Sequence, residues 1–247
     1  TLRGMAGDDL LIGRNGSNLL QGGDGDDTLD GGGGVDRLEG GIGNDIFLDG
    51  SGVFDGGAGD DVIGVFLEDG DEAIEAQQTD GVITVGDTVI QAQLVSVEGL
   101  VIDLAGGNDT VSLGSLDGAD ISFVSIVGGS GDDIVIGDAA GIAVRVHGGD
   151  GDDTLSGGSG EAVLSGGDGD DTLDFSRATG GLTVNLDLAG SQQGIGGGYG
   201  QAHLESIEAV LGGAFNDVIS GDGAANTLSG GEGSDRIEGA GGDDTLM

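Results

Sequence analysis

Large apolar residues recur at intervals of nine along the first part of the chain. They are Leu11, Leu20, Leu29, Leu38 and Phe47, and Ile63 is the next of the set. Each lies at the centre of a three-residue segment such as Thr28-Leu29-Asp30. In so short a strand the central side chain points to one face and its two neighbours point to the other. The pattern therefore predicts very short β-strands, each with one inward side chain, separated by turns of six residues.

The turns carry a second pattern, Gly-Gly-x-Gly-x-Asp, which becomes a nonapeptide when x-U-x follows it, U being a large apolar residue. Clear copies begin at Gly22, Gly31, Gly40, Gly56, Gly128, Gly148, Gly166 and Gly230, and weaker copies at Gly4, Gly13, Gly157, Gly212, Gly221 and Gly239. Glycine adopts positive φ and allows close backbone approach, so glycines in a fixed phase indicate tight turns rather than disorder. Two nonapeptides supply two turns and two strands, which form one flattened coil of 18 residues. The chain is therefore predicted to be all-β: a right-handed parallel β-roll, or β-helix solenoid, with irregular β inserts.

Breaks in the period divide the chain into five segments. Repeat blocks are expected at residues 1–64, 128–174 and 212–247. Residues 65–127 form an irregular insert, in which the alternation at residues 82–85 and the Gly86-Asp87 turn predict a hairpin. Residues 175–211 form a second insert, in which residues 194–200 are expected to be a flexible loop. The two inserts share an echo, since Leu-Val-Ser-Val-Glu-Gly-Leu at residues 94–100 matches Leu-Glu-Ser-Ile-Glu-Ala-Val at residues 204–210.

Acidic residues dominate the composition. There are 46 Asp and Glu residues against six basic ones, and the formal net charge is −40. Such a field repels nucleic acid and anionic lipid, and it attracts cations. The chain contains no Cys, which excludes disulfides, thiolate nucleophiles and Cys-based metal sites. No run approaches the roughly 18 apolar residues of a membrane span, so neither nucleic-acid binding nor membrane insertion is expected.

The sixth position of the nonapeptide puts an acid or an amide at the same point of successive turns. Because a coil has 18 residues, Asp27 is expected to lie between Asp9 and Asp45, with coils about 4.7–4.9 Å apart. Carboxylate and carbonyl oxygens at this density suit Ca²⁺, which takes 6–8 oxygen ligands, better than Mg²⁺, which demands a stricter octahedron. The candidate metal ligands are Asp9, Asn18, Asp27, Asp36, Asp45, Asp61, Asp109, Asp133, Asp153, Asp171, Asp217, Asn226, Asp235 and Asp244. Several Ca²⁺ ions are therefore the expected cofactor, and their binding is expected to drive folding.

Some turns depart from this pattern. Asn18 and Asn226 offer only a neutral oxygen, so their sites are expected to be weaker. Ala162 offers none, which predicts a gap in the row of ions. The fifth-position acids, such as Asp8 and Asp26, are expected to be solvated surface charge rather than ligands.

The nonapeptides resemble the RTX family (repeats-in-toxin, or haemolysin-type calcium-binding repeats), and the resemblance covers most of the chain. It implies that the sixth-position side chains and the carbonyls of the glycine turns bind Ca²⁺ between successive coils. It also implies that the roll stays unfolded in a low-calcium cytosol and folds after type I secretion. The expected function is therefore structural or scaffolding work outside the cell or at its surface.

No motif in the sequence predicts catalysis. The two histidines, His147 and His203, are expected to be ordinary strand residues, and the HExxH, GxSxG and phosphate-binding-loop motifs are absent. Three alternatives stay open: the carboxyl-terminal module of a secreted metalloprotease or lipase whose catalytic domain lies elsewhere, a calcium-dependent filament of copies stacked end to end, and an adhesin. The expected partners are therefore calcium ions, together with other copies of the chain or the rest of a larger secreted protein.

Overall fold

The structure, a computed structural model, describes residues 1–48, 50–79, 82–86, 90–116, 121–137 and 141–247. Within these residues the regular structure is β-strand, with a single 3₁₀ turn, η1 (Leu186–Leu188), and no α-helix. The chain divides into two compact units. The first consists of Thr1–Leu67, Ala73–Asp103 and Leu113–Ser125, and the second of Glu68–Glu72, Leu104–Ser112 and Ile126–Met247.

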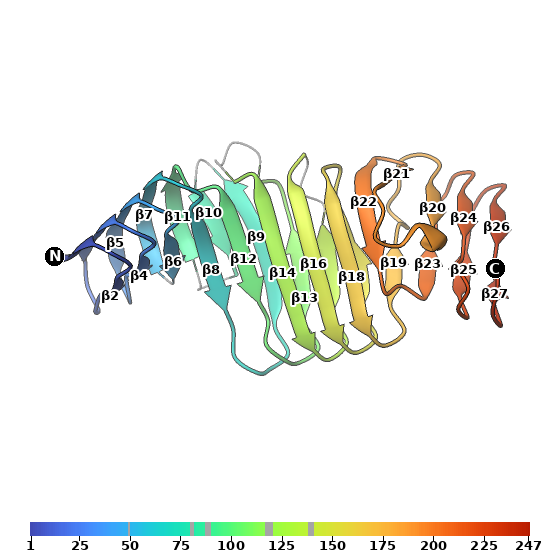
Figure 1. The fold of residues 1–247 in the computed structure, drawn as a ribbon, viewed down its shortest axis with the longest axis horizontal. Coiled ribbons are helices and arrows are strands. Elements are labelled where there is room, and N and C mark those ends of the chain that lie inside the picture. The colour runs from blue at the N-terminus through green and yellow to red at the C-terminus, as the bar shows by residue number, and fades with distance from the viewer. Residues whose placement is uncertain (49, 80–81, 87–89, 117–120, 138–140) are drawn as a thin grey trace. The chain divides into compact units, whose positions relative to one another are not determined.

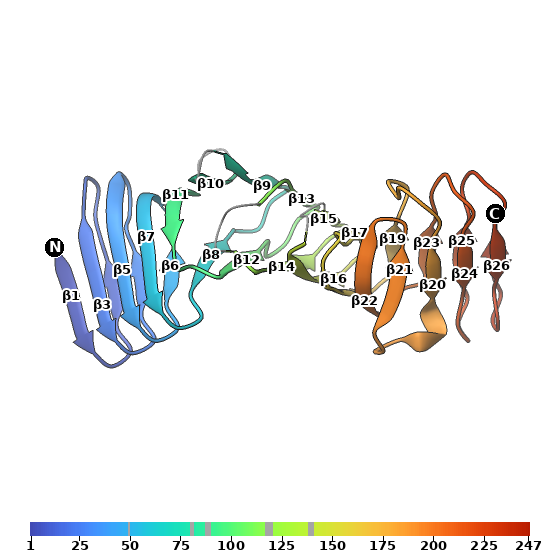
Figure 2. The same cartoon turned by 90° about the horizontal axis from the view of Figure 1, so that it is seen from above.

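In the first unit the chain alternates between two sheets, so that each coil adds one short strand to each of them (Figures 1 and 2). The first sheet has the order β1 (Leu2–Ala6), β3 (Leu19–Asp24), β5 (Val35–Ile42), β7 (Gly50–Ala58), β11 (Ile90–Val95), β10 (Val82–Val85) and β9 (Ala73–Thr79). The second has the order β2 (Leu10–Ile12), β4 (Thr28–Asp30), β6 (Ile46–Leu48), β8 (Val62–Phe66) and β12 (Gly99–Asp103).

The inward residues of the first unit form a continuous core between the two sheets. Strands β3 and β5 are parallel and pair Leu20 with Leu38, while β4 and β6 pair Leu29 with Phe47. All six residues of the nine-residue apolar series are buried. The ring of Phe47 stacks on Phe54 of the opposite sheet, with centroids 5.6 Å apart. The predicted 18-residue coil and its inward positions are therefore confirmed here.

The predicted hairpin in the first insert is also present. Strands β10 and β11 pair in antiparallel register, with Val82 opposite Gln93; residues 87–89 of its turn lie outside the described residues. Strand β9 adds to β10 in antiparallel register as well. Strand β11 then returns to parallel pairing with β7, so that Leu94 lies beside Phe54. The insert is therefore an antiparallel excursion that rejoins the coil.

In the second unit the strands again add coil by coil. One sheet has the order β13 (Thr110–Leu113), β15 (Ile134–Gly137), β17 (Thr154–Ser156), β19 (Thr172–Asp174), β23 (Ala209–Leu211), β25 (Thr227–Ser229) and β27 (Thr245–Leu246). Another has the order β14 (Phe123–Ser130), β16 (Ala143–Asp150), β18 (Ala162–Asp168), β22 (Tyr199–Glu205) and β21 (Gln193–Gly196). The third consists of β20 (Thr183–Asn185), β24 (Val218–Ser220) and β26 (Arg236–Glu238). Both histidines lie on strands as predicted, His147 on β16 and His203 on β22.

The expectation of a flexible loop at residues 194–200 is wrong. Strands β21 and β22 form an antiparallel hairpin in which Gly196 pairs with Tyr199. Gly197 and Gly198, with φ of 60° and 97°, make its tight turn. The hairpin is anchored from both sides, because Ile195 is buried and the ring of Tyr199 packs edge-on against Phe175 at 4.8 Å. The glycines therefore serve a defined turn, and two apolar anchors order it.

Candidate metal centre

Eight of the sixth-position aspartates, together with three glutamates, form one continuous ladder of hydrogen bonds in each unit. In the first unit the backbone N–H groups of Asp9, Asp27 and Asp45 each donate to Oδ1 of the Asp one coil further on, at 2.8–2.9 Å. The next step differs, since the N–H of Asp61 donates to Oε2 of Glu98 at 3.0 Å. We call Asp9, Asp27, Asp45, Asp61 and Glu98 the first ladder. The second ladder runs in the same way, with bonds of 2.7–2.9 Å, through Glu72, Asp109, Asp133, Asp153, Asp171 and Glu208.

In every Asp that accepts one of these hydrogen bonds, Oδ1 is fixed and Oδ2 has no partner. Among the described residues, the buried carboxylate oxygens without a partner are Oε2 of Glu72 and Oδ2 of Asp9, Asp27, Asp36, Asp45, Asp61, Asp109, Asp133, Asp153 and Asp171. Most of these residues are deeply buried, with Asp45, Asp61 and Asp171 fully so, while Asp9 and Glu72 are half-buried. A buried charge with no compensating group is strongly unfavourable. These oxygens therefore require a cation or a proton.

The free oxygen of each turn faces a backbone carbonyl of the next coil. A Cβ on Gly4 would lie 2.5 Å from Oδ2 of Asp9 and 2.8 Å from the carbonyl oxygen of Gly22. The same two kinds of oxygen surround the opening glycines Gly22, Gly40, Gly128 and Gly148. Two oxygens that both lie so near one point are within about 5 Å of each other, which two ligands of one Ca²⁺ at 2.3–2.6 Å can span. The motif needs glycine here because a side chain would fill the space between carboxylate and carbonyl.

The donor set fits Ca²⁺ and is poor in side chains. Among the described residues no group of three or more His, Cys, Asp or Glu side chains converges on a point where it could hold a metal ion. The turns instead present one or two carboxylates and several carbonyls, all of them hard oxygen donors. Ca²⁺ accepts irregular coordination by mixed carboxylate and carbonyl ligands. Backbone oxygens are therefore available to supply the ligands that side chains do not.

Burial raises the pKa values of several carboxyl groups inside the ladders. Burial is the largest cause for Asp27, Asp45, Asp133 and Asp171, and the N–H donated by the preceding coil only partly offsets it. For Asp61 and Asp153 the pKa rises to about 6, again chiefly through burial and then through neighbouring carboxylates. The folded chain without a metal therefore disfavours the very charges that a cation would stabilise.

Two candidate pairs, Asn18 with Asp36 and Asp217 with Asp235, stack on the edge opposite the ladders, whereas Asn226 and Asp244 stack on the edge of the second ladder, beyond Glu208. Not all of these side chains leave an oxygen free. The N–H of Asn18 donates to Oδ1 of Asp36 at 2.7 Å, that of Asp217 to Asp235 at 2.9 Å, and that of Asn226 to Asp244 at 3.0 Å.

Three of these side chains bond to backbone groups of their own turns. The amide nitrogen of Asn18 donates to the carbonyls of Arg14 and Gly16, so these two oxygens are already engaged. Oδ2 of Asp217 accepts from the N–H of Gly213, and Oδ1 of Asn226 from that of Asp222, both at 2.9 Å. These three turns are therefore less suited to Ca²⁺ than the ladders.

The fifth-position side chains form an exposed ladder whose hydrogen bonds run the other way, with each carboxylate accepting from the N–H of the following coil. Oδ1 of Asp8 accepts from the N–H of Asp26 at 3.0 Å, and Oδ1 of Asp26 accepts from that of Asn44 at 2.7 Å. Asp132 and Asp152 continue the arrangement in the second unit. These acids lie at the surface, as expected, and each also holds the next coil.

Three acids of the ladders were not among the sequence candidates: Glu72, Glu98 and Glu208. None follows a Gly-Gly-x-Gly-x turn, so the nonapeptide cannot locate them. Glu98 and Glu208 do occupy equivalent positions in the two echoed segments, residues 94–100 and 204–210. That echo was the signal available in the sequence.

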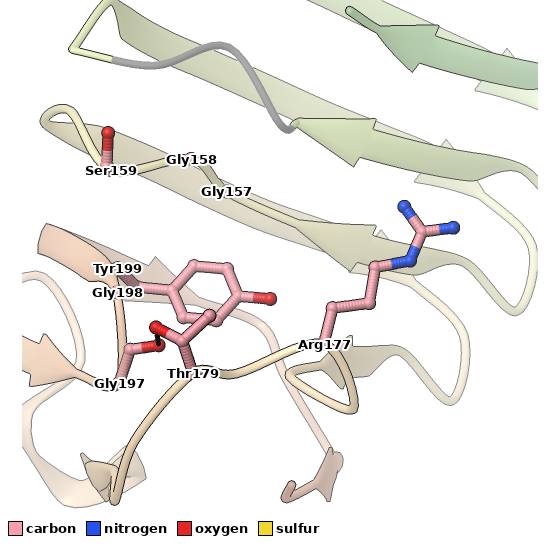
Figure 3. A pocket seen from close by; sticks show the side chains of 8 residues that line it. All are labelled: Gly157, Gly158, Ser159, Arg177, Thr179, Gly197, Gly198 and Tyr199. Carbon is pink, nitrogen blue, oxygen red and sulfur yellow. Dashed lines mark hydrogen bonds between the residues drawn. The ribbon is translucent and has the colours of Figure 1, made fainter.

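The second unit also has a surface hollow of about 160 Å³, lined by Gly157, Gly158, Ser159, Arg177, Thr179, Gly197, Gly198 and Tyr199. Figure 3 shows the Tyr199 ring and the Arg177 side chain bordering it, while Oγ1 of Thr179 donates to the carbonyl of Gly197 at 3.1 Å. None of these eight residues carries a carboxylate, an imidazole or a thiol. Its polar side-chain groups are the hydroxyls of Ser159, Thr179 and Tyr199 and the guanidinium of Arg177.

The sequence was compared with the profiles of known protein families, and one profile matches the segments that carry most of the ladder aspartates. The family profile of the RTX calcium-binding nonapeptide repeat, four copies long, matches residues 1–19, 12–47, 124–140, 145–177 and 211–246, more than half of the chain. The chain belongs to the RTX calcium-binding repeat family. No curated protein matches it significantly. The RTX repeats are calcium-binding repeats rather than a catalytic family, and they account for the solenoid and for its acidic turns.

The raised pKa values predict that acid partly replaces calcium in this RTX chain. Asp61 and Asp153 have a pKa of about 6 when folded, against 3.8 for an unperturbed Asp. Between about pH 4 and 6 the folded chain therefore holds protons that the unfolded chain releases, so stability falls as pH rises through this window. In calcium-free buffer the β signal in circular dichroism should be stronger at pH 5 than at pH 7.5.

A matched pair of variants checks the origin of this response. Asp61→Asn removes a titrating group of the first ladder and should reduce the pH dependence, whereas Asp60→Asn changes an exposed neighbour and should preserve it. A calcium-free spectrum that is the same at both pH values would contradict the prediction.

Proposed function

We propose that this chain is a calcium-dependent structural module that works outside the cell, unfolded where calcium is scarce and folded into a solenoid where calcium is abundant. The observation that carries the proposal is the pair of ladders, whose buried carboxylate oxygens have no partner and face the carbonyls of the next coil. Binding Ca²⁺ there converts repulsion into coordination, so the free energy of binding becomes free energy of folding.

The remaining features favour a scaffold over a catalyst. The ladders run along the edges of stacked coils and use their polar groups to hold one coil on the next. Among the described residues, no helical segment has the length and apolarity needed to cross a membrane. The net charge of −40 disfavours nucleic acid and anionic surfaces as partners. We therefore assign the module a supporting role in a secreted or surface-exposed protein, delivered by type I secretion.

The calcium concentration at which the chain folds tests the location. Extracellular calcium modules have dissociation constants of about 10⁻⁴–10⁻³ M, whereas intracellular sensors respond at about 10⁻⁷–10⁻⁵ M. Titration of the chelated chain, followed by circular dichroism at pH 7.5, should give a cooperative transition with a midpoint of about 0.1–1 mM.

A midpoint below about 1 μM would let the chain fold inside a cell and would contradict the extracellular role.

A glycine variant tests whether calcium binds beside the turns. Gly22→Ala, which places a methyl group against Oδ2 of Asp27 and the carbonyl of Gly40, should move the midpoint to higher calcium. Gly223→Ala, where a methyl group meets open space, is the matched control.

A further inference from the structure

Both ladders reach a glutamate that lies two residues after a serine. In the first unit, Ser96 and Glu98 follow strand β11, and in the second, Ser206 and Glu208 follow strand β22. The N–H of Asp61 donates to Oε2 of Glu98, and the N–H of Asp171 to Oε2 of Glu208, at 3.0 and 2.9 Å. Each glutamate carboxylate thus takes the place that the next Asp carboxylate occupies everywhere else in the ladder.

The serine carbonyl takes the place of the glycine carbonyl in the same way. A Cβ on Gly56 would overlap both Oδ2 of Asp61 and the carbonyl oxygen of Ser96. A Cβ on Gly166 would overlap both Oδ2 of Asp171 and the carbonyl oxygen of Ser206. The free Asp oxygen and the carbonyl therefore meet here as they do between two ordinary repeats.

The backbone conformation explains how three residues replace a turn of six. Ser96 and Ser206 have φ of 48° and 50°, in the left-handed region that non-glycine residues rarely adopt. The turn tightens so far that the N–H groups of Glu98 and Gly99 both donate to the carbonyl of Asp61, at 2.9 and 3.0 Å. Glu208 and Ala209 repeat this on Asp171, at 3.1 and 2.8 Å. The shortened turn leaves its backbone further from the preceding coil, and the longer glutamate side chain still reaches the N–H of the ladder Asp there.

We propose that Glu98 and Glu208 are calcium ligands, each completing a terminal site. One site comprises Oδ2 of Asp61, the carbonyl of Ser96 and the carboxylate of Glu98. The other comprises the equivalent groups of Asp171, Ser206 and Glu208. The proposal rests on the proposed calcium-binding function and extends it from the nonapeptides to the Ser-x-Glu segments between them.

A purely structural role for the two glutamates does not account for the buried charge. Oε2 alone satisfies the N–H of the preceding coil, and a neutral Gln would do so equally well. Yet Oδ2 of Asp61 and Oδ2 of Asp171 are buried without any partner, and each faces a carbonyl dipole of like polarity. Adding a second carboxylate to such a place is unfavourable unless a cation binds there. A calcium ion supplies the missing charge.

The Ser-x-Glu turn also interrupts the ladder of N–H to carboxylate hydrogen bonds. The carbonyl of Glu98 accepts from the N–H of Ser122 at 2.7 Å, and that of Glu208 from Thr227 at 2.9 Å. Neither glutamate donates its own N–H to a carboxylate in the following coil, as each ladder Asp does. The segment therefore closes the calcium site of its own ladder while the solenoid continues, and in the second unit Asn226 and Asp244 stack on the same edge beyond Glu208.

Counting bound ions tests this directly. The variants Glu98→Gln and Glu208→Gln keep the hydrogen-bond acceptor and remove the charge. At the lowest free calcium that saturates the unmodified chain, equilibrium dialysis with metal analysis should find one ion fewer in each variant and two fewer in the double variant. The controls Glu75→Gln and Glu205→Gln remove the same charge from exposed strand positions and should leave the count unchanged.

Equal counts in the variants and the controls would overturn the proposal while leaving the proposed function intact. A complete lack of calcium binding by the unmodified chain would overturn both. If a Gln variant does not fold in calcium, Glu98→Asp and Glu208→Asp, which keep the charge but shorten the reach by one methylene, provide the measurement. They too should lose one ion each, and an undiminished count would again reject the terminal sites.

Discussion

Removing calcium is expected to unfold both units of the solenoid. The ladder carboxylates repeat at the spacing of neighbouring coils, about 5 Å, where two bare charges repel by roughly 1 to 3 kcal/mol per pair. Their free oxygens are buried, so water cannot solvate them. In excess chelator at pH 7.5 the chain should show a coil spectrum and a radius of gyration near the roughly 55 Å of an unfolded chain of this length. Millimolar Ca²⁺ should restore the β signal cooperatively.

Magnesium is the control for this experiment. It demands a near-ideal octahedron and keeps several waters, which turns built from fixed carbonyls and buried carboxylates cannot accommodate. Equimolar Mg²⁺ should therefore restore little of the β signal in the chelated chain. A compact, β-rich chain in chelator would show that hydrophobic burial suffices without the ion, and would contradict the prediction.

The coil and its inward residues could be predicted from the sequence, because the nine-residue period alone determines which residues lie on the same sheet. Leu20, Leu29 and Leu38 lie nine residues apart, and a chain that turns twice in 18 residues must put alternate members on the same sheet. The same arithmetic placed Asp27 beside Asp45 and Asp153 beside Asp171. A one-dimensional fold of this kind depends on nearest neighbours only, so the local pattern determines it.

Glu98 and Glu208 could not be predicted as ladder members from the sequence, because they do not follow the nonapeptide spacing that identifies the aspartates. A nonapeptide separates its first glycine from its aspartate by five residues, whereas Glu98 lies two residues after Ser96. The glutamate carboxylate reaches the position of a nonapeptide aspartate only because the serine has a left-handed backbone conformation and the glutamate side chain is longer. The hairpin of β21 and β22 was missed for a similar reason: its glycines look like a loop, and its order comes from Tyr199 packing on Phe175, a contact between segments far apart in sequence.

A single substitution inside the second ladder should have the largest effect of any point change. Asp153 is buried between Asp133 and Asp171, and its free oxygen faces the space beside Gly148 and the carbonyl of Gly166. Asp153→Asn keeps an oxygen to accept the N–H of Asp133 but removes the charge. Ligand charge count sets calcium affinity over orders of magnitude, so the midpoint of calcium-induced folding should rise by about tenfold or more.

The same substitution should act in the opposite direction without calcium. Burial and the neighbouring carboxylates raise the pKa of Asp153 to about 6, so replacing it with a neutral residue relieves repulsion in the metal-free ladder. In calcium-free buffer at pH 7.5, the Asp153→Asn variant should therefore reach a given β signal at a lower concentration of a stabilising osmolyte than the unmodified chain does. Asp152→Asn removes an equal charge from the exposed neighbouring position and should change neither quantity by more than about twofold, because surface charges are screened by water and salt. If both variants shift the calcium midpoint equally, the buried ladder is not where calcium binds, and only the net charge of the chain matters.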